Sequence, residues 1–233
     1  MAAAERGFKI RIRRALSLTL EPLFEAIRYD LNVNPDVILK PFHIEQALRW
    51  LYVEWGYKQA LWFSRNFEFE KKNDIWQLKL ENWFDTEGAR KVTAILGTTK
   101  ELIKPVLVDA IKWAEEGQSI DEISASIKTQ VNKAGGVMSE GRATTIARTE
   151  VIGAANVATH QVAADIGDNL EKRWVTGGTN VRATHIEAER MGWIPFNEPF
   201  IVGDYHMQHP GDPNGGAEEV INCKCVEVYR TIT

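Results

Sequence analysis

Two cysteines and a few histidines near the C-terminus are the residues of this chain best suited to chemistry. Cys223 and Cys225 are separated by one residue, and His185, with His206 or His209, supplies nitrogen donors. On a strand, residues two apart point to one face with their backbones ~7 Å apart, so both sulfurs can reach one tetrahedral ion. The pattern therefore predicts a zinc site formed by His185, Cys223, Cys225 and His209.

A corner held together without metal is the alternative use of these residues. The spacing is not that of a standard zinc finger, and a disulfide across one intervening residue would be strained. In that case His185 hydrogen-bonds to a loop carbonyl, and the two thiols are buried and inert. Both readings give Cys223 and Cys225 a structural role facing His185. Two cysteines are also typical of reduced thiols in the cytoplasm rather than of a disulfide scaffold.

Hydrolysis is the second chemistry that these residues allow. His185, Glu187, Glu189 and Asp212 can be combined as an acid–base set, and Cys225 with His185 as a nucleophile and its base. However, the sequence has no HExxH, no GxSxG and no glycine-rich phosphate loop. We therefore predict that the protein is not an enzyme, with a metal-dependent nuclease or other hydrolase as the alternative.

Cations gather at the N-terminus. Residues 1–14 hold five basic residues against one acid, while the whole chain has a net charge of −4. Because a dedicated nucleic-acid binder is normally basic, we expect only weak, sequence-independent DNA contact through Arg11, Arg13 and Arg14. The slope of log K against log salt should not exceed roughly five. A frayed, solvated terminus is the alternative.

Tryptophans gather just downstream. Five of the eight lie between residues 50 and 83, on segments with helical spacing. Aromatic side chains are enriched at protein interfaces, so Trp50, Trp55 and Trp62 are candidate partner contacts. Burial at the centre of a helical bundle is the commoner explanation for such a helix.

The elements that position these residues follow from composition and periodicity. The 233 residues are 44% hydrophobic and 26% charged, an ordinary globular balance, and no apolar run is long enough to span a membrane. Apolar spacing and capping residues predict helices, some of which should start at hydroxyl N-caps with a Glu three residues on. The expected helices cover residues 15–33, 42–67, part of 68–97, 98–116 (capped by Thr98 and Glu101), a segment after Ser119 (capped with Glu122), and 139–167.

After Gly167 the pattern changes to short strands and turns. Strands are expected at 174–175, 193–196 and 200–202, and over 222–232. The fold class is therefore α+β, a mostly helical body with a small C-terminal β-rich module. Small residues in the helix from Ser139 indicate close packing at the centre of the body. We expect its Glu150 to form an ion pair with Arg182 and so to hold the module against it.

The segment from about Thr98 to Tyr229 resembles the phage Mu F-like head morphogenesis family. The motifs that carry the resemblance occur in order: GRATTIARTEVIGAANVATHQVAAD, the K-x-W of Lys172 to Trp174, NVRATH, EPFIVG, PGDP, AEEVINCKC and VEVY. Two positions depart from the family pattern, with Asn180 in place of an Asp and Lys224 in place of an Arg. The resemblance implies that structural motif residues are Arg142, Arg148, Thr149, Glu150, Asn156, Trp174, Arg182, Pro210, Asp212 and Asn222.

The resemblance also implies a function. Such proteins are minor head proteins of tailed bacteriophages, which act in head morphogenesis near the portal vertex and in DNA packaging or delivery. The implied domains are 1–97, which would dock on portal or capsid, and 98–233, with helices over 98–167 and the β module over 168–233. Expected partners are the portal protein, the major capsid or scaffolding protein, and packaged DNA. The expected location is the head interior near the portal, after assembly in the host cytoplasm. Deleting residues 1–67 should then abolish incorporation while leaving the rest folded.

Overall fold

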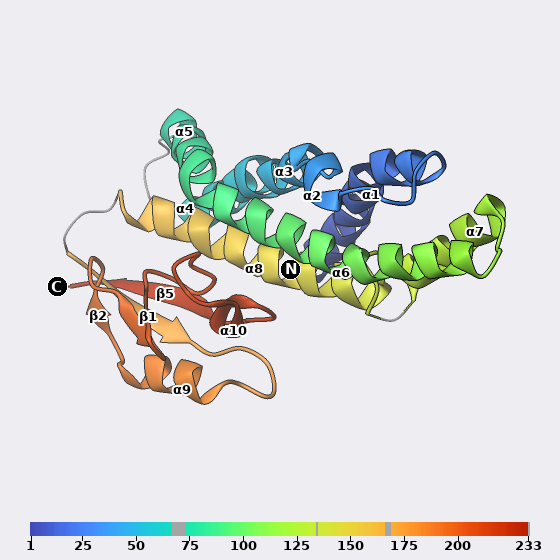
Figure 1. Cartoon of the computed structure of the whole chain (residues 1–233). Coiled ribbons are helices and arrows are strands. Elements are labelled where there is room, and N and C mark those ends of the chain that lie inside the picture. Colours follow the sequence, from blue (N-terminus) through green and yellow to red (C-terminus); the bar gives the residue numbers. More distant parts are fainter. Residues whose placement is uncertain (67–72, 134, 166–168, 233) are drawn as a thin grey trace.

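A computed structural model describes residues 1–66, 73–133, 135–165 and 169–232, and it confirms the α+β class (Figure 1). Long helices form an elongated body, and the β-rich module lies against one side of it. None of the described helices combines the length and apolar composition needed to cross a bilayer. The body contains α1 (Ala2–Ile27), α2 (Pro35–Ile38), α3 (Phe42–Arg49), η1 (Trp50–Trp55), α4 (Gly56–Asn66), α5 (Asn73–Trp83), η2 (Phe84–Gly88), α6 (Ala89–Glu115), α7 (Ile120–Asn132) and α8 (Glu140–Ala163).

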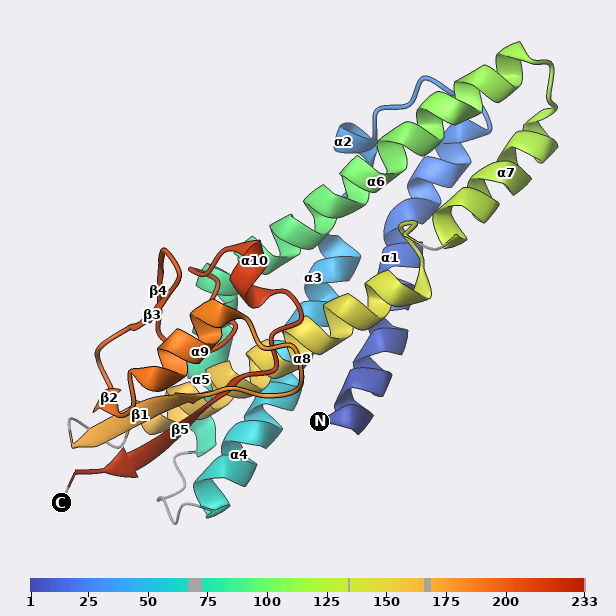
Figure 2. The same ribbon diagram turned by 90° about the horizontal axis from the view of Figure 1, so that it is seen from below.

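Helix α8 is the central element of the body, as its small residues predicted. It packs against α1 and α4 on one side and meets the β module on the other (Figures 1 and 2). Ser139 caps its first turn by accepting a hydrogen bond from the backbone N–H of Arg142. Ala147, Ala154 and Ala158 are buried, and their small side chains let neighbouring helices approach closely.

Local capping signals gave one correct and one wrong helix start. The capping box of Ser119 and Glu122 is present at the start of α7. The predicted start at Thr98 is wrong, because α6 continues from Ala89 to Glu115 and passes through it. The Thr98 hydroxyl instead donates to the Ala94 carbonyl one turn earlier. The predicted boundary between residues 97 and 98 therefore falls inside a helix.

The basic N-terminal segment is helical rather than frayed. Helix α1 begins at Ala2, and Phe8 and Ile12 are fully buried in a core shared with α8. Their spacing continues the apolar pattern of residues 15–27 towards the N-terminus, and this burial stabilises the first turns.

Residues 42–66 form the predicted long helical segment, with a π-helical stretch, η1, at its centre. Tyr52 in η1 is fully buried, and Trp50 and Trp55 pack on the same core. Since α1, α3 and α4 contribute to this core, deleting residues 1–67 would expose α8. We therefore expect such a deletion to destabilise the remaining body rather than to leave the rest folded. Phe67 and Gly167, where two predicted helices end, lie outside the described residues.

The module contains two small antiparallel sheets, with strand order β2-β1-β5 in one and β3-β4 in the other. Strand β1 pairs along its length with β5, which brings Trp174 opposite Glu227. The cysteines precede β5 rather than lying on it, and α9 and β4 were not predicted. The elements are β1 (Leu170–Val175), α9 (Ala183–Arg190), β2 (Ile194–Pro195), β3 (Phe200–Val202), β4 (Tyr205–Met207), α10 (Ala217–Val220) and β5 (Val226–Thr231).

Candidate functional site

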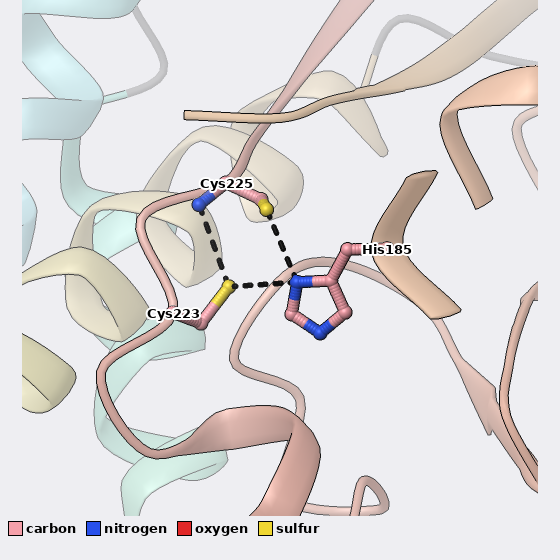
Figure 3. A group of neighbouring side chains, drawn as sticks. All are labelled: His185, Cys223 and Cys225. Atoms are coloured by element: carbon pink, nitrogen blue, oxygen red, sulfur yellow. Dashed lines mark hydrogen bonds between the residues drawn. The ribbon is translucent and has the colours of Figure 1, made fainter. Parts of the chain in front are cut away.

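His185, Cys223 and Cys225 meet in the interior of the β module, as Figure 3 shows. His185 lies in the first turn of α9, and the cysteines lie in the loop between α10 and β5. Their three ligand atoms are within 4.8 Å of one another, with His185 Nδ1 3.3 Å from Cys225 Sγ and 3.8 Å from Cys223 Sγ. All three residues are buried, each 3% exposed or less. The alternation along the chain explains this, because Val226 and Val228 point outward and Cys225 and Glu227 inward.

The opposite side of the His185 ring faces a carboxylate. Nε2 lies 2.9 Å from Glu219 Oε2, an ion-pair distance whose angle is not that of a hydrogen bond. The Thr184 hydroxyl donates to the same carboxylate oxygen at 2.8 Å. Trp174 packs edge-on against the ring, with 5.3 Å between ring centroids. The imidazole is therefore held by contacts on several sides, and Nδ1 is directed at the sulfurs.

The two sulfurs differ in how readily they lose a proton. Hydrogen bonding with the Cys223 thiol lowers the pKa of Cys225 well below its usual range, although burial alone would raise it. The His185 ring and the backbone N–H of Gly177 act in the same direction as the thiol. The same hydrogen bond and burial raise the pKa of Cys223. The arrangement therefore favours ionisation of Cys225 over that of Cys223.

The prediction that His209 completes this group is wrong. Among the described residues, the cluster of metal-ligating side chains contains His185, Cys223 and Cys225 alone. His209 is buried elsewhere, with its ring centroid 5.3 Å from that of His160 and its Nδ1 3.2 Å from the Pro210 carbonyl oxygen. His206 is exposed on β4. The turn at residues 208–214 directs His209 towards α8. The position of His209 in the sequence did not indicate the direction of this turn.

His209 belongs to a second buried polar group, between α8 and the sheet. His160 Nδ1 lies 2.9 Å from Glu227 Oε1, which also accepts a hydrogen bond from Tyr229. Burial alone would raise the pKa of Glu227, but the two histidines and Tyr229 together lower it. Lys172 is fully buried nearby and donates to the Gln208 carbonyl and side chain. Burial lowers the pKa of Lys172 to about 8.

We expect His209 to make the protein acid-sensitive. Burial, and then the neighbouring His160, lower the pKa of His209 below its usual 6.5, although Asp212 and Glu227 oppose this. The folded state thus binds fewer protons than the unfolded state, so stability is present above about pH 6.5 and is lost as pH falls through the lowered pKa. In chemical denaturation at pH 7 to 5, His209→Gln should reduce this slope by up to about 1.4 kcal/mol per pH unit. His206→Gln is the exposed control, and equal slopes for both variants would contradict the expectation.

Side chains of α8 tie the module to the body. Thr149 Oγ1 accepts a hydrogen bond from the backbone N–H of Asn222 at 2.9 Å. Two turns further along α8, Asn156 Nδ2 donates to the carbonyl oxygens of Pro210 and Cys225, both at 3.1 Å. Asn222 has a positive φ of 59°, which an Asn side chain tolerates better than most. These bonds anchor both the turn at Pro210 and the cysteine loop to the same helix face.

Arg142 lies on the same face of α8 but points to the helical body. Its guanidinium donates to the carbonyls of Val137 and Ile95 and to the Thr99 hydroxyl. Burial lowers its pKa to about 10, so it remains a cation at neutral pH. Arg142 therefore links α8 to α6, not to the module.

The predicted ion pair between Glu150 and Arg182 is wrong. Glu150 is 6% exposed and faces the body, where its Oε2 accepts a hydrogen bond from Tyr52 at 2.7 Å and lies 3.3 Å from Lys91 Nζ. Arg182 donates instead to the Ile221 carbonyl. Glu150 follows Thr149 directly on the helix, and the 100° turn between them sends one to each side of α8.

Three further motif residues have local roles. Arg148 lies 3.9 Å from Glu5 of α1, a partly exposed ion pair. Trp174 is fully buried and packs edge-on against Phe200. Asp212 accepts hydrogen bonds from the backbone N–H groups of Gln208 and Asn214, which closes the PGDP turn.

The acid–base set imagined for a hydrolase does not come together. Glu187 is exposed and pairs with Arg190, while Glu189 accepts from the backbone and hydroxyl of Thr176. The carboxylate of Asp212 already accepts the backbone hydrogen bonds of its own turn. The pair of Cys225 and His185 is in contact at 3.3 Å but is buried, so a substrate could reach it only if the module opened.

A groove of about 580 Å³ lies away from these groups, between α6, α8 and the segment around α10. Its lining is mainly apolar, with Ile95, Leu102, Ile146 and Val220 among the residues that form it. None of its lining residues belongs to the His185 group. The groove and the thiols are therefore separate features.

The candidate contact residues of the N-terminal region have mixed surroundings. Lys9 and Arg13 both pair with Glu140 of α8, and Arg11 lies over the Trp50 ring at 4.0 Å. Trp50 and Trp55 are only partly exposed and pack on the core, whereas Trp62 is 59% exposed. Arg14 is exposed on α1. Only part of the predicted contact set is therefore available at the surface.

Sequence reasoning missed several residues that build these sites. Glu219 behind His185 lies inside the AEEVINCKC motif, so its position six residues before Cys225 was a usable signal. Lys91 and Tyr52, the partners of Glu150, lie outside every motif. Their sequence separation from Glu150 gave no sign of contact.

The protein combines a helical body with a small β module that packs on an Ala-rich central helix. Residues 101–228, more than half of the chain, match the family described as Phage Mu protein F like protein. The chain is also 30% identical over 151 residues to the uncharacterized protein YqbB of Bacillus subtilis (strain 168). That alignment covers 62% of this chain and 46% of YqbB, so the chain spans about half the length of this curated relative. No solved structure matches.

The chain belongs to the Phage Mu protein F like family. Membership of this family indicates a phage head morphogenesis protein. The matched segment starts inside α6 and ends in β5, so it includes α8, the thiols and all of the buried polar group except Tyr229.

Proposed function

We propose that the protein is a minor head protein of a tailed phage, which joins the head at or near the portal vertex and assists DNA packaging or delivery. The family match over residues 101–228 is the observation that carries the proposal. In this proposal the protein acts through contacts with other head proteins and weak contacts with DNA. It assembles in the host cytoplasm and resides in the head interior near the portal.

Exposed apolar side chains of the N-terminal helices support a protein contact there. Among the described residues before residue 97, seven large apolar side chains are each more than half exposed, and exposed apolar surface of this kind can serve as an interaction site. They are Met1, Ile10, Tyr29, Val37, Phe42, Trp62 and Leu78. We propose the portal protein as the main partner, with the major capsid or scaffolding protein as the alternative.

Substitutions at this surface test the contact better than a deletion, because they leave the core intact. Ile10→Glu combined with Trp62→Glu should reduce co-sedimentation with portal rings and incorporation into heads at least tenfold. Ile201→Glu changes a comparably exposed residue of the β module and should have no effect. Normal incorporation of the double variant would refute the proposed surface. Localised reconstruction of heads would then show whether the chain sits at the portal vertex at all.

DNA contact should be weak and limited by the ion pairs of α1. Because Lys9 and Arg13 pair with Glu140, the exposed cations Arg6, Arg11 and Arg14 should dominate and give a salt slope of about three. Glu140→Gln frees two cations and should raise the slope towards about five in binding titrations at several salt concentrations. Glu45→Gln, on α3, is the control. An unchanged slope for Glu140→Gln would remove α1 from DNA binding.

The hydrolase alternative rests on the contact between Cys225 and His185. If it holds, the purified protein should cleave DNA or peptide substrates with added divalent ions. A folded Cys225→Ser protein should then lose that activity. We expect no such activity, because both residues are buried.

A further inference from the structure

We infer that His185, Cys223 and Cys225 bind one zinc ion that joins α9 to the cysteine loop, with Glu219 orienting the histidine. The three ligand types are those of protein zinc sites. The revised set omits His209, and it adds a carboxylate that makes contact with the histidine rather than with the ion.

The distances between the ligand atoms are those a tetrahedral ion requires. With Zn–S bonds near 2.3 Å and Zn–N bonds near 2.0–2.1 Å, sulfur and nitrogen ligands lie about 3.6 Å apart and two sulfurs about 3.8 Å apart. The observed separations from His185 Nδ1 are 3.3 Å to Cys225 Sγ and 3.8 Å to Cys223 Sγ. All three atoms are within 4.8 Å of one another. Small side-chain adjustments would therefore complete the geometry without moving the backbone.

Glu219 supplies an independent observation. Histidines that bind metal through one ring nitrogen commonly face a carboxylate or carbonyl with the other, which sets the tautomer and the ring orientation. Here Nδ1 faces the sulfurs, and Nε2 lies 2.9 Å from Glu219 Oε2, itself held by the Thr184 hydroxyl. A core packed only for apolar contact has no need of a buried carboxylate at this position.

The sulfur of Cys223 also lies beside a backbone donor. The backbone N–H of Cys225 points to Cys223 Sγ at 3.4 Å, so this sulfur accepts a hydrogen bond from the chain two residues on. Such N–H donors stabilise negative charge on sulfur. Gly177 comes close on the other side of the loop, since a Cβ added there would lie 2.3 Å from the Lys224 carbonyl oxygen. The loop is thus built around the two sulfurs.

An ion at this place would stabilise a module whose own core is small. The buried apolar cluster around the site has eight members, including both cysteines, and His185 is about 40 residues from them in sequence. Small, loop-rich modules gain much of their stability from such cross-links. Among the described residues no fourth side chain joins the cluster, so the fourth position would fall to water. Because all three ligands are buried, the ion would cross-link α9 and the cysteine loop in the interior of the module, away from substrates in solution.

Metal content and cobalt substitution test the inference on the full chain. Protein purified under reducing conditions should contain about one zinc per chain by elemental mass spectrometry. After chelation, cobalt(II) should bind at the same stoichiometry with a thiolate charge-transfer absorption band. Cys225→Ser should abolish this band, whereas His206→Asn, an exposed histidine of the same module, should retain it.

Glu219→Gln separates positioning from folding. It preserves an acceptor for Thr184 but removes the charge behind His185, so zinc affinity should fall roughly 10–100-fold at unchanged stoichiometry. If Cys225→Ser does not fold, the cobalt titration of the unmodified chain still decides. Absence of both zinc and cobalt binding by the unmodified reduced protein would overturn the inference, as would a His206→Asn effect equal to that of Cys225→Ser. Metal binding by the purified chain does not require incorporation into heads, so the outcome of these experiments is independent of the proposed function.

Discussion

Glu150→Ala is expected to destabilise the protein by about 3–5 kcal/mol, the usual result of breaking a buried ion pair. The substitution leaves Lys91, itself 7% exposed, without its carboxylate in the core beside Tyr52. Tyr52 also loses the acceptor for its hydroxyl, 2.7 Å away. Both groups are then desolvated without compensation. Urea denaturation followed by circular dichroism would measure the loss.

Glu140→Ala, in the first turn of the same helix, is the matched control. Glu140 pairs with Lys9 and Arg13, but its side chain is 60% exposed, and exposed pairs contribute about 0–1 kcal/mol. A similar loss for both variants would show that the environment of Glu150 is not the reason. Restoring stability with the double variant Lys91→Met/Glu150→Leu would support the buried-pair explanation, because an apolar pair of similar volume removes both charges.

Asn156→Asp is expected to detach the β module from α8 and to cost about 2–6 kcal/mol. Asn156 Nδ2 donates to two buried carbonyls, those of Pro210 and Cys225, and each unsatisfied partner costs about 1–3 kcal/mol. Aspartate has the same shape but replaces the donor by an oxygen that faces both acceptors. The loss should be concentrated in the module, so hydrogen exchange should accelerate in β1 and β5 more than in α1.

Asn132→Asp provides the control for the same chemical change. Its side-chain amide donates to the Lys128 carbonyl on the exposed end of α7, where water can replace the bond. Less than about 1 kcal/mol should be lost there. Uniform acceleration of exchange over the whole chain in Asn156→Asp would contradict a local role for Asn156.

Both predictions depend on the position of α8 between the helical body and the β module. One side of the helix carries Glu150 into the core formed with α3, η1 and α6, and the other presents Thr149 and Asn156 to the module. Gly153 lies where these sides are tightest, since a Cβ there would be 2.8 Å from the Tyr52 hydroxyl. On the opposite side, a Cβ on Gly211 would be 3.1 Å from Gly153 Cα. Helix α8 is therefore in close contact with both the N-terminal region and the β module.

The sequence by itself determined the features that depend on neighbouring residues. Apolar periodicity predicted the helical body, small residues predicted the central α8, and Ser119 with Glu122 marked the start of α7. The motifs of the C-terminal half predicted the family, and the family pattern predicted that the side chains of Cys223 and Cys225 would face His185. In each case the physical cause acts between residues that are close in sequence, or the feature belongs to a motif pattern that the family shares.

Only the tertiary structure decided which distant groups meet. A threonine hydroxyl can cap a helix or bond to the carbonyl one turn back, and packing of α6 selected the second for Thr98. Likewise, one helical step decides whether Glu150 meets Lys91 or Arg182, and the path of one turn directs His209 to His160 rather than to the sulfurs. Such outcomes depend on how helices cross and how turns direct the chain, and these are set by packing throughout the protein. The residue types alone leave them open.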